Sequence, residues 1–368
     1  MKNIINFAAM LTAVIINVSC SNDDTMTLDQ VISNAYGDTI YVNYEGNSVS
    51  LAGKNAAFAT ASGAHVTITD SLRENYLVIK LSGSTSNGSL TVFRSKKYEI
   101  VMNGVNITNP TGPAINNQCK KSLWITTLKG TTNTLTDGTN YTESATIQQK
   151  GTLFSEGQMY FSGSGTLNVN GNCKNAIACD DYIVINTPQT INIASTAGNG
   201  IKANDGFTIS DGVLTINVSA DGGKGIKSDD ITEIIGGTID ITTTGGSKYD
   251  AELADYSSAA GIKSDSTLTM SGGTLTIHSY GEGGKGINCD HDIVFSGGTL
   301  YAETTGDKIY SAPKAVKSDT AITISGGSFT ARSADSWACS IGEDNTFPNI
   351  VGTPTTRTET KKEYIIIF

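Results

Sequence analysis

The sequence predicts an all-β fold, a right-handed single-stranded parallel β-helix with three short strands in each coil of about 24 residues. Three observations predict it. A segment such as "GIKSDSTLTMSGGTLTI" recurs along the chain at a nearly constant interval. Each copy contains short runs in which apolar and polar residues alternate, and no long helical run separates the copies. The handedness follows the general rule for parallel crossover connections.

The repeat is defined by two landmarks. The first is the G-I-K-S-D element, whose copies begin at Ile177, Ile201, Ile226, Ile262, Ile287 and Val316. The second is the T-L-x-I element, anchored on Leu167, Ile191, Leu214, Ile239, Leu275, Leu300 and Phe329. Both series expand at the same places, so the copies share one register. The regular spacing is interrupted by an insert at about 245–258 and a smaller one at about 304–313.

Each copy contains three strand-like runs. In the copy that begins at residue 261, the inward positions are Ile262 with Ser264, Leu268 with Met270, and Leu275 with Ile277. A period of two indicates a strand with one buried face. One copy cannot bury that face alone, but stacked copies can, with like residues forming ladders inside. A β-sandwich is the competing fold, but it would not require identical corners at a fixed period.

The two ends of the chain are less regular. A β-helix has open ends that must be covered to prevent edge pairing. We therefore expect N-terminal capping strands at 40–93 and a C-terminal cap or irregular tail at 336–368, on either side of the parallel β-helix at 94–335. Before them we expect a signal peptide at 1–19 and a lipidated Cys20 with a linker at 20–39.

The first twenty residues indicate export. Lys2 precedes an apolar stretch that is too short for a membrane span and suits a signal peptide. The stretch ends in "VSC", with Cys20 followed by the acidic "SNDD", which resembles the processing and export signals of surface-displayed bacterial lipoproteins. We expect a cell-envelope protein on the outer membrane, exposed at the surface and held only by a lipid anchor. The alternative is an ordinary signal peptide with a chance cysteine.

Composition narrows the class of partner. The formal net charge is −10, and this acidic balance argues against a nucleic-acid partner because phosphate contacts need clustered Lys and Arg. The remaining cysteines show no CxxC spacing, and the histidines stand in no metal or catalytic-triad spacing. No nucleophile elbow or zinc-protease motif occurs, so no catalytic residue is assigned. We expect a monomer.

Several segments taken together resemble a known family. "MNGVNITNPTGPAIN", "GTTNTLTDGTNY", "SGSGTLNVNGN" and the "GIKSD…SGGTLTI" coils resemble a bacterial family of carbohydrate-binding β-helix proteins, over about residues 75 to 335. The resemblance implies a polysaccharide-lyase-like fold, bound calcium, and binding of cellulose or pectic acid without established lyase activity. Many members carry an acidic residue in the corner before the repeated Ile. Here that corner reads Asn199, Lys224, Ala260 and Lys285, which puts calcium at those corners in doubt.

The outward residues of the repeat allow two interpretations. Lys263 and Lys317 belong to a column of lysines, each followed two residues later by an acidic or amide residue. One interpretation is a structural Lys–Asp ladder on the solvent face, which we favour. The other is an extended track that binds uronate carboxylates.

The inserts carry the other candidate binding residues. Both leave the coil at the same corner, so we expect them to project on the same side and to support binding on a rigid scaffold. The candidate ligands of a Ca²⁺ ion, which prefers carboxylate and carbonyl oxygens, are Asp250, Glu252, Asp255 and Asp307. The candidate sugar-binding rings are Tyr249, Tyr256, Tyr301 and Tyr310.

These observations favour a non-catalytic surface lipoprotein that binds a polysaccharide, with plant cell-wall or acidic glycans as ligands and calcium assisting. The first alternative is a polysaccharide lyase acting on pectic substrates, with a lysine of the outer column as base. The second is a structural or adhesive cell-surface protein. If the tyrosine and acidic residues of the inserts only form local packing, the inserts are ordinary polar loops.

Overall fold

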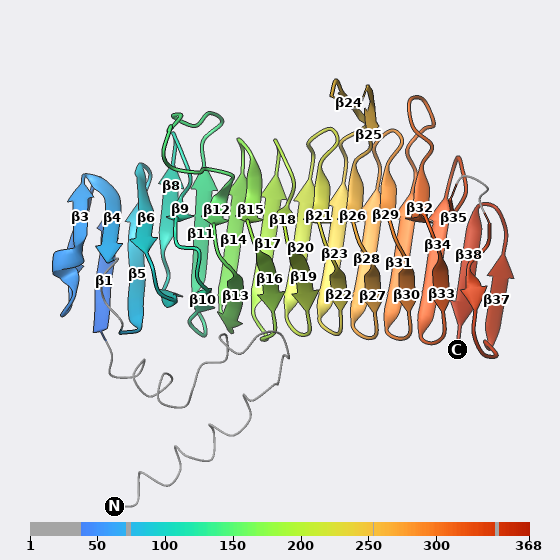
Figure 1. Ribbon diagram of the computed structural model, residues 1–368, viewed down its shortest axis with the longest axis horizontal. Helices are drawn as coiled ribbons and strands as arrows, with labels where there is room; N and C mark the ends of the chain where they lie inside the picture. Colours follow the sequence, from blue (N-terminus) through green and yellow to red (C-terminus); the bar gives the residue numbers. More distant parts are fainter. Residues whose placement is uncertain (1–37, 71–74, 253, 343–345) are drawn as a thin grey trace, which may run out of the picture.

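The computed structural model describes residues 38–70, 75–252, 254–342 and 346–368. The predicted signal peptide and Cys20 lie outside these residues. The described chain forms a long stack of short strands, with a single 3₁₀ turn at Ala56–Phe58 near the first coil (Figure 1). Across these residues, no helix has the length and apolar character that crossing a membrane requires.

The predicted parallel β-helix is confirmed, and its strands form three walls. The first wall contains β3 (Ala59–Ser62), β4 (Ala64–Asp70), β6 (Gly88–Arg94), β9 (Ile115–Asn117), β12 (Gly151–Ser155), β15 (Asn175–Cys179), β18 (Ile201–Ala203), β21 (Lys224–Ser228), β26 (Ala260–Ser264), β29 (Lys285–Cys289), β32 (Lys314–Ser318) and β35 (Cys339–Ile341). It carries the G-I-K-S-D elements.

The second wall begins with β1 (Asp38–Glu45), which also pairs with β2 (Ser48–Ala52). It continues through β5 (Leu77–Thr85), β7 (Tyr98–Met102), β10 (Leu123–Thr127), β13 (Met159–Gly163), β16 (Tyr182–Ile185), β19 (Gly206–Ile209), β22 (Thr232–Ile234), β27 (Leu268–Met270), β30 (Ile293–Phe295), β33 (Ile322–Ile324) and β36 (Asn349–Ile350).

The third wall carries the T-L-x-I elements. Its strands are β8 (Asn106–Asn109), β11 (Thr132–Asp137), β14 (Thr166–Gly171), β17 (Thr190–Ser195), β20 (Val213–Val218), β23 (Thr238–Thr243), β28 (Thr274–Ser279), β31 (Thr299–Thr304) and β34 (Ser328–Ser333), followed by β38 (Glu363–Ile367) and β37 (Thr356–Glu359).

The register of the stack is the one that the repeat predicts. Ile226 pairs with Ile262 and Ile262 with Ile287 in the first wall, and all three are buried. In the third wall Leu275 pairs with Leu300 in the same way. Like residues therefore stack in the core, where each apolar side chain is covered by its counterparts one coil above and below.

Two repeated glycines are required by close approach. A Cβ atom on Gly261 would lie 2.3 Å from Cγ2 of Ile277 and 2.8 Å from the carbonyl oxygen of Gly286. Gly273 has a φ of +77°, and its Cβ would lie 2.7 Å from the backbone of Gly236 in the preceding coil. The first glycine leaves room for the third wall, and the second allows the corner between the second and third walls to turn.

The ends of the stack differ from the predicted boundaries. Parallel pairing begins well before residue 94, because β1 already pairs with β5 and β4 with β6. It also continues beyond residue 335, where β35 pairs in parallel with β32. The final apolar strand β38 then pairs antiparallel with β34 and β37, which covers the last coil. The weaker repeat at both ends concealed these coils from sequence analysis.

Candidate functional site

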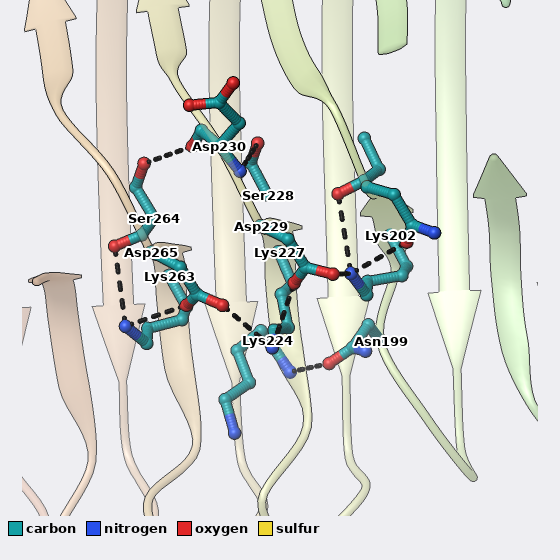
Figure 2. A network of polar contacts seen from close by, with 12 residues as sticks. Asn199, Lys202, Lys224, Lys227, Ser228, Asp229, Asp230, Lys263, Ser264 and Asp265 are labelled. Carbon is teal, nitrogen blue, oxygen red and sulfur yellow. Dashed lines mark hydrogen bonds and ion pairs between the residues drawn. The ribbon is translucent and has the colours of Figure 1, made fainter. Parts of the chain in front are cut away.

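The outward lysines of the first wall form a ladder with the acidic residues beside them. Lys227 lies 3.2 Å from Asp229 of its own coil and 3.4 Å from Asp265 of the next coil (Figure 2). Lys263 lies 2.9 Å from Asp265 and also pairs with Asp290. Each ammonium group thus bridges two coils, as the structural interpretation of this column predicted.

The ladder accounts for both lysines that were candidate ligands. The Nζ atom of Lys317 lies 2.5 Å from Oδ1 of Asp319, and Lys263 has its two carboxylate partners. Such partly exposed pairs are each worth about 0–1 kcal/mol. The arrangement therefore neutralises like charges that stand one coil apart, and gives the lysines a structural role whether or not they also contact a ligand.

The two inserts project on the same side of the stack (Figure 1). The first forms a hairpin of β24 (Lys248–Asp250) and β25 (Asp255–Ser257), in which Tyr249 pairs with Tyr256. The second, residues 305–313, connects β31 to β32 without a strand of its own. Both leave the coil between the third wall and the first, so the scaffold places them next to each other.

Three of the four candidate tyrosines form one cluster, which we call the tyrosine platform: Tyr249, Tyr256 and Tyr310. The rings of Tyr256 and Tyr310 stack with centroids 4.4 Å apart and planes 8° from parallel. The ring of Tyr249 meets Tyr256 edge-on, with centroids 5.3 Å apart. Tyr310 is 62% exposed and Tyr249 is 54% exposed. Rings from both inserts thus present aromatic surface to solvent while they brace each other.

The carboxylate of Glu282 fastens the two inserts beneath this platform. Its Oε1 atom accepts hydrogen bonds from the backbone N–H groups of Ile309, Tyr310 and Ser311, at 3.2, 2.8 and 3.0 Å. Its Oε2 atom accepts one from the N–H of Ser247 at 3.3 Å. Despite partial desolvation, these hydrogen bonds lower the pKa of Glu282 to about 2. The carboxylate is therefore charged at any physiological pH.

The ammonium group of Lys285 fastens the same inserts from within. Its Nζ atom donates to the carbonyl oxygens of Gly283 and Ala312, at 2.8 and 2.7 Å. It also contacts the hydroxyl oxygens of Ser258 and Ser311, at 3.2 and 2.9 Å. Burial, together with the nearby ammonium groups of other lysines, lowers the pKa of Lys285 to about 7. Lys285 thus links the base of the hairpin to loop 305–313.

Lys224 makes a similar contact two coils earlier. Its Nζ atom lies 2.5 Å from the carbonyl oxygen of Gly222 and 2.8 Å from Oγ of Ser257. Burial lowers its pKa to about 8. At this corner, where many members of the resembling family carry an acidic residue, Lys224 and Lys285 instead donate hydrogen bonds to backbone and hydroxyl oxygens under the inserts.

Tyr301 lies apart from the platform. It occupies an outward position of β31 on the third wall, where its ring contacts His278 with centroids 5.6 Å apart. The guanidinium carbon of Arg332 lies 5.7 Å from the centre of the Tyr301 ring. Tyr301 does not join the platform because it belongs to strand β31 and not to an insert, and the strand fixes the direction of its side chain.

The acidic candidates for calcium binding are only partly brought together. Asp250 and Asp255 are partners across the hairpin, and their carboxylates accept the N–H groups of Glu252 and Tyr256, at 2.9 and 2.7 Å. Asp307 lies in the other insert. Within the described ranges, no group of three or more His, Cys, Asp or Glu residues is arranged to hold a metal ion. Calcium binding stays a prediction from the resemblance.

Sequence reasoning did not assign a role to Glu282 or Lys285, and it missed an aromatic row on the second wall. In this row, Trp124 and Tyr160 pair in register and stack with centroids 5.0 Å apart, and Tyr182 follows edge-on at 5.7 Å from Tyr160. An alignment of the outward positions of the irregular N-terminal coils would have shown this row. Because its rings cover one another, we interpret it as a stabilising ladder.

Comparisons with known proteins agree with this architecture. A family model described as carbohydrate-binding domain-containing protein matches residues 62–233 and 217–308. A solved structure described as the polysaccharide lyase-like protein from C. thermocellum, a gadolinium derivative, superimposes with a TM-score of 0.56. The two chains are 24% identical, and the match covers 70% of this chain and 97% of that one. At this identity, the similarity shows only that the two proteins share a fold. No curated protein sequence matches the chain.

Proposed function

This chain belongs to the family of carbohydrate-binding domain-containing proteins, and on that premise we propose that it binds a polysaccharide on the tyrosine platform without cleaving it. The observation that carries the proposal is the stack of Tyr256 on Tyr310, because it holds exposed rings from two loops in one place. The C–H faces of sugar rings pack against such surfaces, while their hydroxyl groups stay in water or find polar partners.

The scaffold suits a polymeric ligand. Both inserts stand on stacked strands and are fastened by Glu282 and Lys285, so little loop entropy is lost when a ligand binds. The platform is open to solvent and stands on several coils, so a long chain can pass across it without a closed pocket. These features support binding of an extended glycan.

The position of Lys285 does not favour a catalytic role, although its pKa is lowered to about 7. A lyase would need a base that reaches the proton beside a uronate carboxyl group. Lys285 is 6% exposed, and its Nζ atom is surrounded by oxygen atoms of the two inserts. Its position therefore supports a structural role in holding the loops. Lyase activity on pectic substrates remains the alternative function, to be decided by experiment.

Three further parts of the proposal rest on the sequence alone. We propose that the ligands are plant cell-wall or acidic glycans, that calcium assists binding, and that Cys20 attaches the protein to the surface of the outer membrane. Metabolic labelling with a tagged fatty acid tests the anchor, since a Cys20→Ser variant should lose the label. Titration of the purified protein with calcium alone tests the metal, with Asp250→Asn and Asp255→Asn together as the matched variant.

A glycan array is the experiment that tests the function. We expect the mature protein to bind polysaccharides on the array, and the same preparation to release no unsaturated product from pectic substrates. Release of such product would replace the proposal with a lyase. An array without any bound glycan, both with and without calcium, would favour a structural or adhesive protein with a protein partner.

A further inference from the structure

A cleft lies beside loop 305–313, toward the C-terminal end of the stack from the tyrosine platform. It has a volume of about 400 Å³. We call it the lysine cleft, and the residues that define it are Lys308, Lys314, Lys317, Lys361, Asp335 and Trp337. Four ammonium groups thus gather around one cleft in a protein whose formal net charge is −10.

The positive charge of the lysine cleft is only partly neutralised. Lys317 pairs with Asp319, and the carboxylate of Asp335 accepts the backbone N–H of Lys308 at 3.1 Å. Among the residues that the structure describes, the ammonium groups of Lys308 and Lys361 have no carboxylate within ion-pair distance. Both side chains belong to exposed residues, so they can turn toward a ligand.

Burial and the positive charge of the cleft both lower the pKa of Lys314, a lysine that lines it. Burial, followed by the ammonium groups of Lys308, Lys317 and Lys361 in that order, lowers its pKa to about 8. An anion in the cleft would relieve this repulsion, because each added negative charge favours the protonated amines around it.

The aromatic wall of the cleft fits a sugar ring. Trp337 is half-buried, and the Nζ atom of Lys361 lies 5.7 Å from the centre of the Trp337 ring. The ammonium group lies over the ring, so this face of Trp337 becomes available to the C–H groups of a sugar when Lys361 turns toward an acidic substituent.

Another cleft, on the first wall, provides a contrast. Its volume is about 370 Å³, and its lysines are Lys150, Lys174 and Lys202. There Lys150 lies 2.6 Å from Asp180, and Lys202 pairs with Asp229. Two of its three lysines are therefore paired with carboxylates, while the third, Lys174, donates to the carbonyl oxygen of Gln149 at 2.7 Å. In the lysine cleft, by contrast, both Lys308 and Lys361 lack a carboxylate partner among the described residues.

We propose that the lysine cleft binds the anionic groups of a glycan directly through the ammonium groups of Lys308 and Lys361, with no metal ion between them. The inference rests on the proposed function, because loop 305–313 contributes Tyr310 to the platform and Lys308 to the cleft. A glycan chain seated on the tyrosines can therefore place a carboxylate or sulfate group in the cleft one coil further along. Carboxylates and sulfates share the chemistry that the cleft recognises.

The test compares the mature protein with a Lys308→Gln/Lys361→Gln variant. Lys129→Gln is the matched control, because Lys129 is an exposed lysine on a distant turn. Thermal unfolding first establishes that each variant is folded. Affinity is then measured by calorimetry for polygalacturonate, a sulfated glucan, a neutral glucan and free sodium sulfate, each in the presence of a calcium chelator.

We expect the double variant to bind the anionic glycans at least about tenfold more weakly and the neutral glucan unchanged, with the difference shrinking at high salt. Comparison of polygalacturonate with the sulfated glucan identifies the source of the anion. Equal affinity of variant and parent for anionic glycans, loss of binding with the chelator, or binding of free sulfate alone would overturn the inference. If the parent binds only neutral glucan, the inference fails and the proposed function stands; if it binds no glycan either with the chelator or with added calcium, the proposed function fails.

Discussion

The rings of Tyr256 and Tyr310 stack with their centroids 4.4 Å apart, although they belong to two loops that leave different coils. Neither loop would place its ring alone. The carboxylate of Glu282 and the side-chain nitrogen of Lys285 contact both loops at the same corner of the stack. The candidate binding surface is therefore produced by stacking one coil on the next, and the stability of the coils is part of its function.

In four of the six copies, those at Ile201, Ile226, Ile262 and Ile287, a glycine precedes the repeated residue and allows the third wall to approach closely. A Gly261→Ala variant would place Cβ 2.3 Å from Cγ2 of Ile277, so we expect a loss of about 1–3 kcal/mol in the free energy of unfolding. Urea denaturation measures it. Gly246→Ala is the control, since its Cβ would have no neighbour closer than 3.6 Å. Equal stability of Gly261→Ala and the parent would contradict the packing described for this corner.

We expect the Lys–Asp ladder to stabilise the stack weakly and to make no contribution to glycan affinity. Replacing Lys263 by Met removes the ammonium group between Asp265 and Asp290. Because Lys227 still lies 3.4 Å from Asp265 and the carboxylates are partly exposed, we expect a destabilisation of at most about 1 kcal/mol. Glycan affinity should not change. A tenfold loss of affinity in a folded Lys263→Met variant would instead support the uronate track.

The closure of the inserts should depend on pH through Lys285. Its pKa is lowered to about 7 by burial, with Lys317 and Lys314 acting in the same direction and Glu282 in the opposite one. When the loops open, the amine regains a pKa near 10.5, so the open state binds more protons between these values. Closure is then favoured as the pH rises from about 7 toward 10.

Hydrogen exchange measures this effect at the backbone amides of Tyr310 and Ser311, after correction for intrinsic exchange rates. We expect their protection to increase between about pH 6 and pH 9 in the parent protein, and much less in a Lys285→Met variant. Protection that falls over this range would show that the four oxygen contacts of the ammonium group outweigh its desolvation.

The sequence was sufficient for the repeated coils because their apolar residues recur in register. Ile262, Leu268 and Leu275 each occupy the wall that the alternation predicted. The same reasoning failed at the ends, where β1 and β35 belong to coils that have lost the G-I-K-S-D signature. The stacking of strands there depends on backbone pairing, which leaves little trace in single residues.

The candidate site was predicted less completely. Interruptions of the repeat located the two inserts, and aromatic content identified Tyr249, Tyr256 and Tyr310. Glu282 was missed because its partners are backbone N–H groups of a loop in the next coil. Tyr301 was grouped with the platform because it lies close in sequence to one insert, but its strand turns it toward His278.

The most direct test of the account is the affinity of a Tyr256→Ala/Tyr310→Ala variant for the polysaccharide that the parent protein binds. Tyr41→Ala is the control, because Tyr41 is 48% exposed on β1 at the far end of the stack. We predict that the double variant stays folded and loses at least about tenfold in affinity, about 1.4 kcal/mol, while Tyr310→Phe and Tyr41→Ala bind as the parent does. Unchanged affinity in the folded double variant would contradict the assignment of the tyrosine platform as the binding surface.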